Sequence, residues 1–412
     1  MLKSFSQSSL LENKLIKQNN FTTNNYQHKI RMLVLLSFPI LMGMSIDLFA
    51  PSLPAISTSL NTTASISKMV ISIYLIGYAI GNLLIGIITD GIGRKVLLRT
   101  SCVLFVIVSL LPTLIPNEYV LLGSRFCQGF LMGSMGIVTR GIFSDILPPE
   151  KLLKLGPTMG FLWGLGPIAG PIIGGFLQDA FGWKSGFYFF SIIVALLTIL
   201  VFIYIPETLS KKSKLSTAKI KQDITEVITN REFMTLCIAM GIAYSLIISF
   251  NTLGPFLIQD VMGYSAAYFG KLAIFLGCAF LPAPILGRKL LDHYSVGKIF
   301  FVVIHLFIIL TAIFFIISLI NNSISLIIIA TMAVYFTCGS IFPLSMGKGI
   351  SMFRHIPGTA AAIMYFVNIS MTSLTSFLQS YVHAHNITNI ISIYLILMFI
   401  IVGLYWYKLK DL

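Results

Sequence analysis

Two ionisable side chains lie deep inside apolar segments of the sequence. Asp47 is the only acid well inside such a segment, and Arg125 is the only base. In a helix that rises ~1.5 Å per residue, Asp47 lies about 21 Å beyond Leu33, and Arg125 lies about 9 Å beyond Tyr119. If the two helices run in opposite directions through a membrane core about 30 Å thick, the two depths coincide. We therefore expect the pair to share a cavity that handles charge; the alternative is a static ion pair that only fixes helix packing.

Reversible binding of a proton is the chemistry that suits this pair. A charge at such a depth costs roughly 2.5–3.5 kcal/mol even on a lenient insertion scale, so intramembrane ionisable residues usually serve a function. Burial penalises the carboxylate of Asp47, and a guanidinium at the same depth offsets part of that penalty. We expect Asp47 to carry the proton and Arg125 to set its affinity for the proton and sense its charge.

The composition explains how both residues come to lie in a membrane. Hydrophobic residues make up 56% of the 412 residues and charged residues 10%, whereas a soluble protein has about 25% charged residues. Backbone polar groups must be paired in lipid, so an apolar run of about 20 residues must be a helix. We predict an all-α integral membrane protein with twelve transmembrane helices. They are expected at 33–56, 67–89, 96–115, 119–141, 155–178, 186–205, 233–258, 266–286, 299–320, 324–347, 357–381 and 388–407.

The net charge of +14 is a signal of topology. When alternate loops are assigned to opposite sides, 24 of the 28 Lys and Arg residues fall on the side that holds both termini. Only Lys68, Lys184 and Lys271 fall on the other side, and Arg125 lies within a helix. The basic side is cytoplasmic by the positive-inside rule. We therefore expect both termini in the cytoplasm and a lipid bilayer, with no nucleic acid, as the large partner.

The chain divides into two nearly equal halves. Residues 1–31 are polar and are expected to form a disordered cytoplasmic tail. Six-helix bundles are predicted at 32–205 and 232–412, joined by a charged cytoplasmic linker at 206–231 that we interpret as a solvated loop near lipid headgroups. Two equivalent bundles predict a substrate path between them near the membrane midplane, with alternating access by rocking.

One loop carries a specific sequence motif. Residues 86–95 read G-x-x-x-D-x-x-G-R-K. They resemble the loop between helices 2 and 3 of the major facilitator superfamily, although Gly91 stands where the family usually has a base. The resemblance implies a cytoplasmic latch that holds this side shut in the outward-open state. Its expected members are Gly86, Asp90, Gly93, Arg94 and Asp145, with Arg140 also at the cytoplasmic surface; ordinary interfacial charges are the alternative.

Three further motifs narrow the resemblance. Asp47, Pro51 and Pro54 fit the helix 1 motif D-x-x-x-P-x-x-P of bicyclomycin-resistance-type drug exporters, and residues 125–129 fit the helix 4 motif R-x-x-Q-G associated with proton coupling. Leu131 stands where that motif often has a glycine. Helix 5 resembles the antiporter motif G-x-x-x-G-P-x-x-G-G, and its glycines would let a neighbouring helix approach closely. The residues of this motif are Gly166, Pro167, Gly170, Pro171, Gly174 and Gly175.

The sequence indicates a transport pocket and no catalytic site. Aromatic residues with a polar tip suit an apolar, multispecific cavity. Candidates near the midplane are Tyr74, Tyr78, Trp163, Tyr244, Tyr335, Tyr365 and Asn368, each of which is also explained by packing alone. We expect no metal and no cofactor, because His383 and His385 are too few for a metal site and no phosphate loop, H-E-x-x-H or G-x-S-x-G motif occurs.

These observations favour a twelve-helix drug:proton antiporter of the bicyclomycin-resistance type, active in multidrug efflux and antibiotic resistance. We expect a monomer in the bacterial inner membrane that moves small molecules against protons. One alternative is a dedicated exporter of one endogenous metabolite or siderophore. An integral-membrane enzyme would need clustered acids, histidines or a nucleophile, and a permease-like sensor would need an attached soluble domain; the sequence offers neither.

The charge asymmetry predicts the orientation of the chain. Single cysteines introduced at Thr62 and Leu215 of a cysteine-free variant are expected to lie on opposite sides of the membrane. An impermeant thiol reagent added to intact cells should label position 62 and leave position 215 unlabelled. Labelling of 215 with protection of 62 would invert the orientation.

Overall fold

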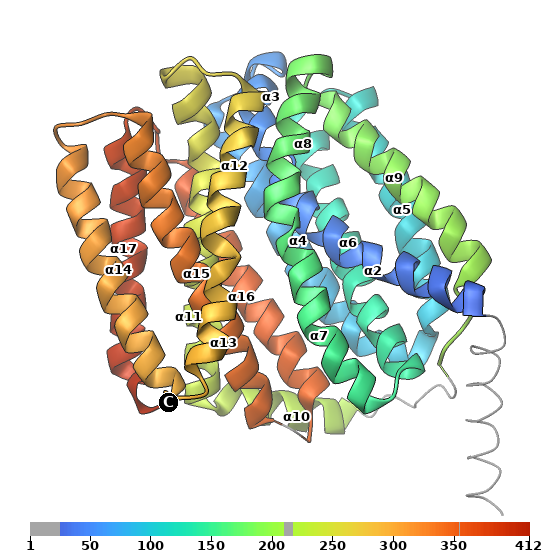
Figure 1. The fold of residues 1–412 in the computed structure, drawn as a ribbon. Coiled ribbons are helices and arrows are strands. Elements are labelled where there is room, and N and C mark those ends of the chain that lie inside the picture. The colour runs from blue at the N-terminus through green and yellow to red at the C-terminus, as the bar shows by residue number, and fades with distance from the viewer. Residues whose placement is uncertain (1–24, 210–216, 354) are drawn as a thin grey trace, which may run out of the picture.

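The computed structural model describes residues 25–209, 217–353 and 355–412, and every regular element in them is a helix (Figure 1). Eleven helical segments in these residues are long and apolar enough to cross a membrane. The twelfth segment, α6 (Glu118–Ile146), has 29 residues and is less apolar because it carries Arg125, Gln128 and several glycines. The predicted all-α membrane fold is therefore confirmed.

Each predicted transmembrane segment corresponds to one helical segment. Those of the N-terminal half are α2 (Asn25–Asp47) continued by η1 (Ala50–Ser52) and α3 (Leu53–Ser59), α4 (Ala64–Ile92), α5 (Arg94–Leu114), α6, α7 (Pro149–Gly164) continued by α8 (Gly166–Phe181), and α9 (Lys184–Tyr204). Those of the C-terminal half are α11 (Arg231–Pro255) continued by η2 (Phe256–Val261), α12 (Ala266–Phe280) continued by α13 (Pro282–Leu290), α14 (Val296–Ser318), α15 (Ile324–Met352), α16 (Pro357–Ser380) and α17 (Ile387–Tyr407), which η3 (Leu409–Asp411) follows.

Two predicted segments outside the membrane differ from the structure. The first helix begins at Asn25, inside the range expected to be a disordered tail, whereas residues 1–24 lie outside the described part. The expected linker loop contains the amphipathic helix α10 (Thr217–Thr229), whose Val227 is fully buried against Phe233 and Met364. Its apolar positions recur at helical spacing, a signal that the high charge of the linker concealed.

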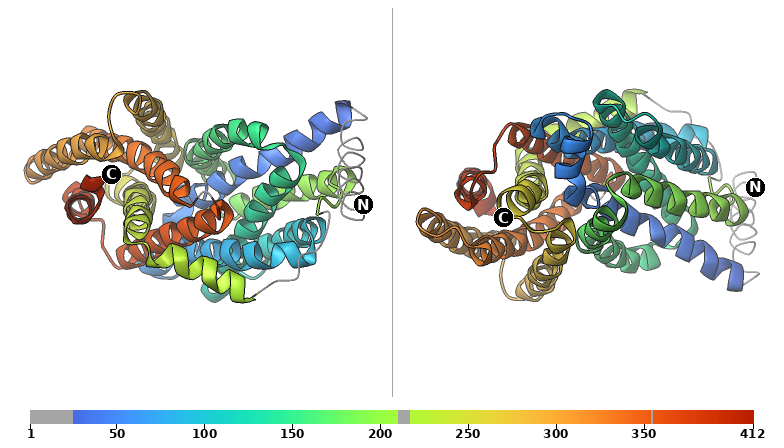
Figure 2. Two further views of the ribbon diagram at one scale, coloured as in Figure 1. Left: turned by 90° about the horizontal axis from the view of Figure 1, so that it is seen from below. Right: turned by 90° about the horizontal axis from the view of Figure 1, so that it is seen from above.

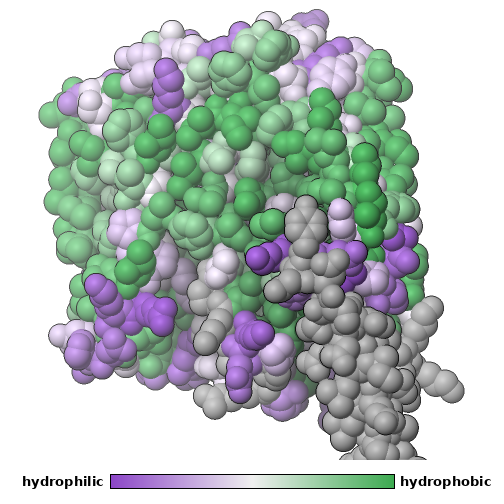
Figure 3. Space-filling view, turned by 45° about the vertical axis from the view of Figure 1, so that its right-hand side comes forward, coloured by the Kyte–Doolittle hydropathy of each residue, from purple (hydrophilic) through white to green (hydrophobic). Residues whose placement is uncertain are grey.

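The halves lie side by side when viewed along the helices (Figure 2). Across their boundary, α4 packs on α16 and α8 packs on α12. We call the two ends of the molecule the α3 end and the α10 end, after the helices found there (Figure 1). Apolar side chains form a belt between these ends, and polar side chains gather toward the α10 end (Figure 3). Exposed residues of the belt include Ile199, Val302 and Ile313, as expected for a surface that faces lipid.

Four membrane-spanning segments are interrupted at prolines. The first segment breaks after Asp47, where Pro51 and Pro54 prevent a continuous helix. The α7–α8 segment breaks at Leu165, before Pro167, and the α12–α13 segment breaks at Leu281, before Pro282. The seventh segment ends its regular α-helix at Pro255 and continues as the π-helix η2. Interrupted helices leave backbone groups free to bind polar atoms inside a membrane protein.

Candidate functional site

Asp47 is the last residue of α2 and is fully buried. Its Oδ1 accepts a hydrogen bond of 2.5 Å from Nδ2 of Asn251, which belongs to α11 of the opposite half and is 2% exposed. Its Oδ2 has no hydrogen-bond partner among the described residues. A buried polar atom without a partner is rare in a native structure and marks a place where a proton, water or ligand can bind. Asn251 was not identified from the sequence.

Arg125 is also buried, at 1% exposure, but it does not pair with Asp47. Its three nitrogen donors bind the backbone oxygens of Val70 (3.2 Å) and Ser45 (3.2 Å) and the side-chain oxygen of Gln128 (3.1 Å). No ion pair joins Arg125 to Asp47 in the described residues, so the alternative of a static ion pair is wrong. The guanidinium finds neutral acceptors on three helices and needs no carboxylate partner.

Arg125 instead caps the end of the helix that carries Asp47. The carbonyl of Ser45 lies in the last turn of α2, where the backbone has no further helical donor. A cation at this end also opposes the negative end of the helix dipole. The rings of Phe49 and Tyr74 cover the guanidinium at 4.4 Å and 4.2 Å, and the Tyr74 hydroxyl lies 2.5 Å from that of Ser45. Arg125 therefore fixes the end of α2 two residues before Asp47.

The glycines of α8 form the groove that holds this end of α2. Gly166 faces Gly43, and Gly174 faces the backbone of Leu48. A Cβ atom on Gly170 would lie 3.1 Å from the nitrogen of Leu48 and 3.3 Å from Cβ of Asp47. Any side chain at these three positions would push α2 away from α8. The motif predicted to allow close helix approach thus lies directly against Asp47.

The remaining glycine of the motif faces the other half. A Cβ atom on Gly175 would lie 3.0 Å from Cα of Ala267 in α12, and one on Gly270 of α12 would lie 3.2 Å from Cα of Ile172 in α8. Pro167 and Pro171 are both buried, and the carbonyl of Pro171 faces Gly270. α8 therefore joins the groove for α2 to the boundary between the halves.

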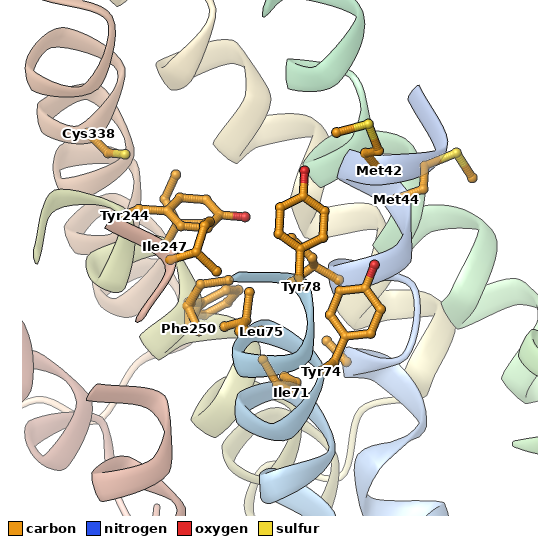
Figure 4. Packing of buried hydrophobic residues seen from close by; sticks show 14 of the residues in the cluster. Met42, Met44, Ile71, Tyr74, Leu75, Tyr78, Tyr244, Ile247, Phe250 and Cys338 are labelled. Carbon is orange, nitrogen blue, oxygen red and sulfur yellow. The ribbon is translucent and has the colours of Figure 1, made fainter. Parts of the chain in front are cut away.

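The predicted pocket residues fall into three environments. Tyr74 belongs to the shell of Arg125, and Tyr244 projects from α11 toward Tyr78 of α4 (Figure 4). In the described part of the chain, the buried hydroxyl of Tyr244 has no hydrogen-bond partner, and neither do the two buried amide atoms of Asn368 in α16. Tyr244 and Tyr335 both lie close enough to Asp47 to interact electrostatically with its carboxylate.

The third group lies between Asp47 and the α10 end. Trp163 of α7 stacks on Phe342 of α15 with ring centroids 6.0 Å apart, and it lies 5.5 Å from Tyr244. Arg140 lies over the ring of Tyr365, which belongs to α16, at 4.2 Å. Because Tyr365 belongs to the C-terminal half, Arg140 lies at the boundary between the halves. It is inside α6, which continues to Ile146, beyond the end at 141 expected from the sequence. These half-buried rings and the guanidinium come from both halves.

Part of the predicted cytoplasmic cluster does assemble, within the N-terminal half. Arg94 Nε lies 3.2 Å from Oδ2 of Asp145, and its Nη1 donates to the hydroxyl of Thr89 at 2.9 Å. The side chain of Glu207 caps α5 by accepting from the backbone nitrogens of Arg94 (3.1 Å) and Lys95 (3.2 Å), a contact that the sequence did not indicate.

Two glycines shape the loop around this cluster. Gly93 has a φ of 118°, a conformation that favours glycine. Gly86 faces the side chain of Ile137 of α6. The side chain of Asp90 lies outside the described part of the chain.

Hydrogen bonds between the two halves cluster toward the α3 end. Lys68 was counted among the few charges of the non-basic side, but it is 2% exposed in α4, and its ammonium group donates to the carbonyl of Val382 at 2.7 Å. The same group lies 4.8 Å from the ring centre of Phe256 and is an electrostatic neighbour of Asp260. The buried amine therefore connects α4 to both η2 and the end of α16.

Two further contacts close this end. The carboxylate of Asp179, in the last turn of α8, accepts from the backbone nitrogens of Ala266 (3.2 Å) and Ala267 (2.9 Å), which begin α12. Gln259 of η2 donates to the carbonyl of Pro51 at 2.9 Å. A carboxylate at a helix N-terminus is stabilised by both the free N–H groups and the helix dipole. The α3 end is thus shut by polar contacts between the halves.

Comparison with known proteins identifies the fold. A family model described as Major Facilitator Superfamily matches residues 34–376. An uncharacterized MFS-type transporter of Bacillus subtilis, YdgK, is 25% identical over 85% of this chain and 88% of its own length. The multidrug resistance protein MdtL of Vibrio parahaemolyticus is 27% identical over 59% of this chain and 60% of its own length.

Solved structures share the fold at low sequence identity. The D-xylose-proton symporter matches with a TM-score of 0.71 at 16% identity, over 90% of this chain and 96% of its own. A bacterial homolog of the human lysosomal transporter Spinster, in an inward-facing and unoccupied conformation, matches with a TM-score of 0.73 at 11% identity, over 94% and 98%. The chain belongs to the Major Facilitator Superfamily and is a transporter, not an enzyme.

The α8 groove predicts a strong effect of Gly170→Leu. The new side chain would displace Leu48 and the backbone on which Asp47 sits, so we expect transport to be abolished while the protein still reaches the membrane. Gly403→Leu is the matched control, because that glycine of α17 is exposed with no atom within 4 Å of an added Cβ. Resistance or substrate accumulation in a pump-deficient bacterium reports transport, and immunoblotting of membranes reports insertion. Full activity of Gly170→Leu would show that the groove is incidental.

The cap from Asp179 predicts a shift in conformation. Asp179→Ala removes a surface charge–dipole contact, which should favour opening of the α3 end by up to about fivefold. Spin labels at the exposed positions Thr58 and His385, one in each half, should show a larger population of long distances. Asp292→Ala, which removes an exposed carboxylate from the α13–α14 connection, should leave the distances unchanged. If both variants give the wild-type distribution of spin-label distances, the contact of Asp179 with α12 does not keep the α3 end closed.

Proposed function

We propose that this protein is a proton-coupled antiporter that exports drugs or other small amphipathic molecules by alternating access. The observation that carries the proposal is the state of Asp47. This buried carboxyl lies at the break of the first membrane segment. One of its oxygens is bound by the opposite half, and the other has no partner within the described part of the chain. Such a group can bind a proton or the polar group of a substrate at the same atom.

Competition for Oδ2 of Asp47 would produce antiport. A deprotonated carboxylate attracts a cationic or polar group that arrives from the cytoplasm. A proton that enters from the other side neutralises the same oxygen and releases the substrate. Arg125 would act on this exchange through the end of α2, because it binds the carbonyl of Ser45 and makes no ion pair with Asp47. The role that we propose for Arg125 is therefore indirect.

The orientation follows from the charge distribution. We assign the α10 end to the cytoplasm, because the positive-inside rule places the basic loops and both termini there. The polar contacts at the α3 end would then close the periplasmic side of a bacterial inner membrane. The half-buried residues Trp163, Tyr365 and Arg140 would line the way from the cytoplasm to Asp47. The cluster of Arg94 and Asp145 lies on this cytoplasmic side, where we propose that it meets the C-terminal half in the outward-open state.

Two observations support drug export over uptake. The antiporter motif of α8 holds the segment that carries Asp47, so the motif and the proposed coupling residue form one unit. The partial match to MdtL proteins points in the same direction, because those proteins are named multidrug resistance proteins. A dedicated exporter of one metabolite would share this geometry, and a panel of diverse compounds tested with and without an uncoupler would distinguish it by its single substrate.

The central prediction concerns Asp47→Asn. The amide cannot take up a proton at this site, so uphill efflux driven by a pH gradient should be lost. The neutral amide should also bind a cationic substrate more weakly, but downhill exchange should persist at saturating substrate concentration. The measurement uses proteoliposomes that hold the purified protein and a compound identified by the panel screen. Arg125→Ala should also lose uphill efflux, because the end of α2 is no longer fixed.

The control for this prediction is an acid outside the membrane core. Asp411→Asn removes a carboxylate at the exposed C-terminus and should pump at the wild-type rate. Equal uphill rates for Asp47→Asn and wild type would show that Asp47 is not the proton carrier. Loss of both uphill and downhill movement would assign Asp47 to substrate binding alone.

A further inference from the structure

Asn251 is the one hydrogen-bond partner that the structure gives to the carboxyl of Asp47. The bond joins α2 to α11, so it connects the two halves in the membrane interior. It also makes the two oxygens of the carboxyl different, because Oδ1 accepts this bond and Oδ2 has no partner among the residues that the structure describes. A donor to a carboxylate is worth more than a donor to a neutral group, since the hydrogen bond is assisted by charge.

The position of the bond makes it sensitive to the state of the α3 end. At ~1.5 Å per residue, Asp47 lies about 18 Å from the end of α3 and Asn251 about 15 Å from the end of η2. Both are therefore nearer to the α3 end than to the α10 end. Rocking that opens the α3 end must separate α2 from α11 at this level, and a hydrogen bond of 2.5 Å does not survive such a separation.

Other groups around the carboxyl do not supply the same contact. Tyr74 of α4, Tyr244 of α11 and Tyr335 of α15 are electrostatic neighbours of Asp47 but form no hydrogen bond with it in the described residues. Arg125 of α6 directs its donors to neutral oxygens. Among the described residues, Asn251 is thus the only donor to the carboxyl, and it belongs to the half that moves relative to Asp47.

We propose that Asn251 is the positioning residue for Asp47: it holds Oδ1 while the α3 end is closed, presents Oδ2 alone to proton or substrate, and releases the carboxyl when the α3 end opens. The proposal rests on the proposed function in one respect, which is that Asp47 takes up a proton. It adds a physical connection between the conformation of the transporter and the state of the coupling carboxyl.

Infrared spectroscopy of the purified protein in lipid tests this proposal without a substrate. A protonated carboxyl has a carbonyl stretch that falls in frequency when the carbonyl accepts a hydrogen bond. Acidification of the wild type should produce a band that is absent from Asp47→Asn, which assigns the band. Asn251→Leu should move this band to higher frequency. Asn251→Ala should do the same and serves as the second variant if the leucine protein does not fold.

The matched control is Asn82→Leu, because Asn82 of α4 is fully buried and neither of its amide atoms has a partner among the residues described. It should leave the Asp47 band in place. An unmoved band in both Asn251 variants would overturn the positioning role. A spectrum in which Asp47→Asn removes no band would instead overturn the proton-carrier role on which the proposed function depends, so the two failures are distinct.

The dependence on conformation has its own measurement. Asp179→Ala, which should open the α3 end, is expected to add a second Asp47 band at the frequency found in Asn251→Leu. The hydroxyl of Ser373 donates to the backbone carbonyl of Ser72 across the halves at 2.8 Å. A chemical cross-link between cysteines introduced at these two positions should keep the α3 end closed and so abolish the second band. A single unshifted band in an Asp179→Ala sample whose spin labels report an open end would show that Asn251 does not release Asp47.

Discussion

The central helices pack around one buried carboxyl, that of Asp47. A charged group in the membrane core costs several kcal/mol unless its surroundings compensate. The chain meets this requirement for Asp47 by breaking the first segment at Pro51, by placing the glycines of α8 against its backbone, and by bringing Asn251 from the opposite half. The second oxygen of the carboxyl is left without a partner. The features described as separate motifs are therefore parts of one environment.

This environment lies on the boundary along which the transporter must move. The contacts at the α3 end use single polar groups against backbone atoms, as in Lys68 with Val382 and Asp179 with the first residues of α12. These charge-assisted hydrogen bonds can be exchanged for bonds to water when the end opens, which suits a gate that opens repeatedly. Toward the α10 end, the halves meet through rings and the guanidinium of Arg140. The difference in contact chemistry agrees with a structure closed at the α3 end.

The sequence predicted the helices and the buried charges well, because both depend on local rules. Apolar runs of sufficient length must be helices in lipid, and ionisable residues inside them are conspicuous. It did not predict the partners. Matching depths suggested that Asp47 and Arg125 share a cavity, yet depth says nothing about the direction of a side chain around its helix, and Arg125 turns to the end of α2. Asn251 and Lys68 were missed because a single amide or a lysine near a helix start has no pattern of its own. The linker helix α10 was concealed by its charge.

The account depends on Asp47 being a group that takes up a proton within the folded transporter. Proton uptake by the purified protein measures this most directly: a weakly buffered solution is titrated with acid, and the protons bound are compared between wild type and Asp47→Asn under identical conditions. The account predicts that the wild type binds one more proton per molecule than the variant. Superimposable titration curves would contradict it, because the buried carboxyl would then stay in a single protonation state and could not exchange a proton for a substrate.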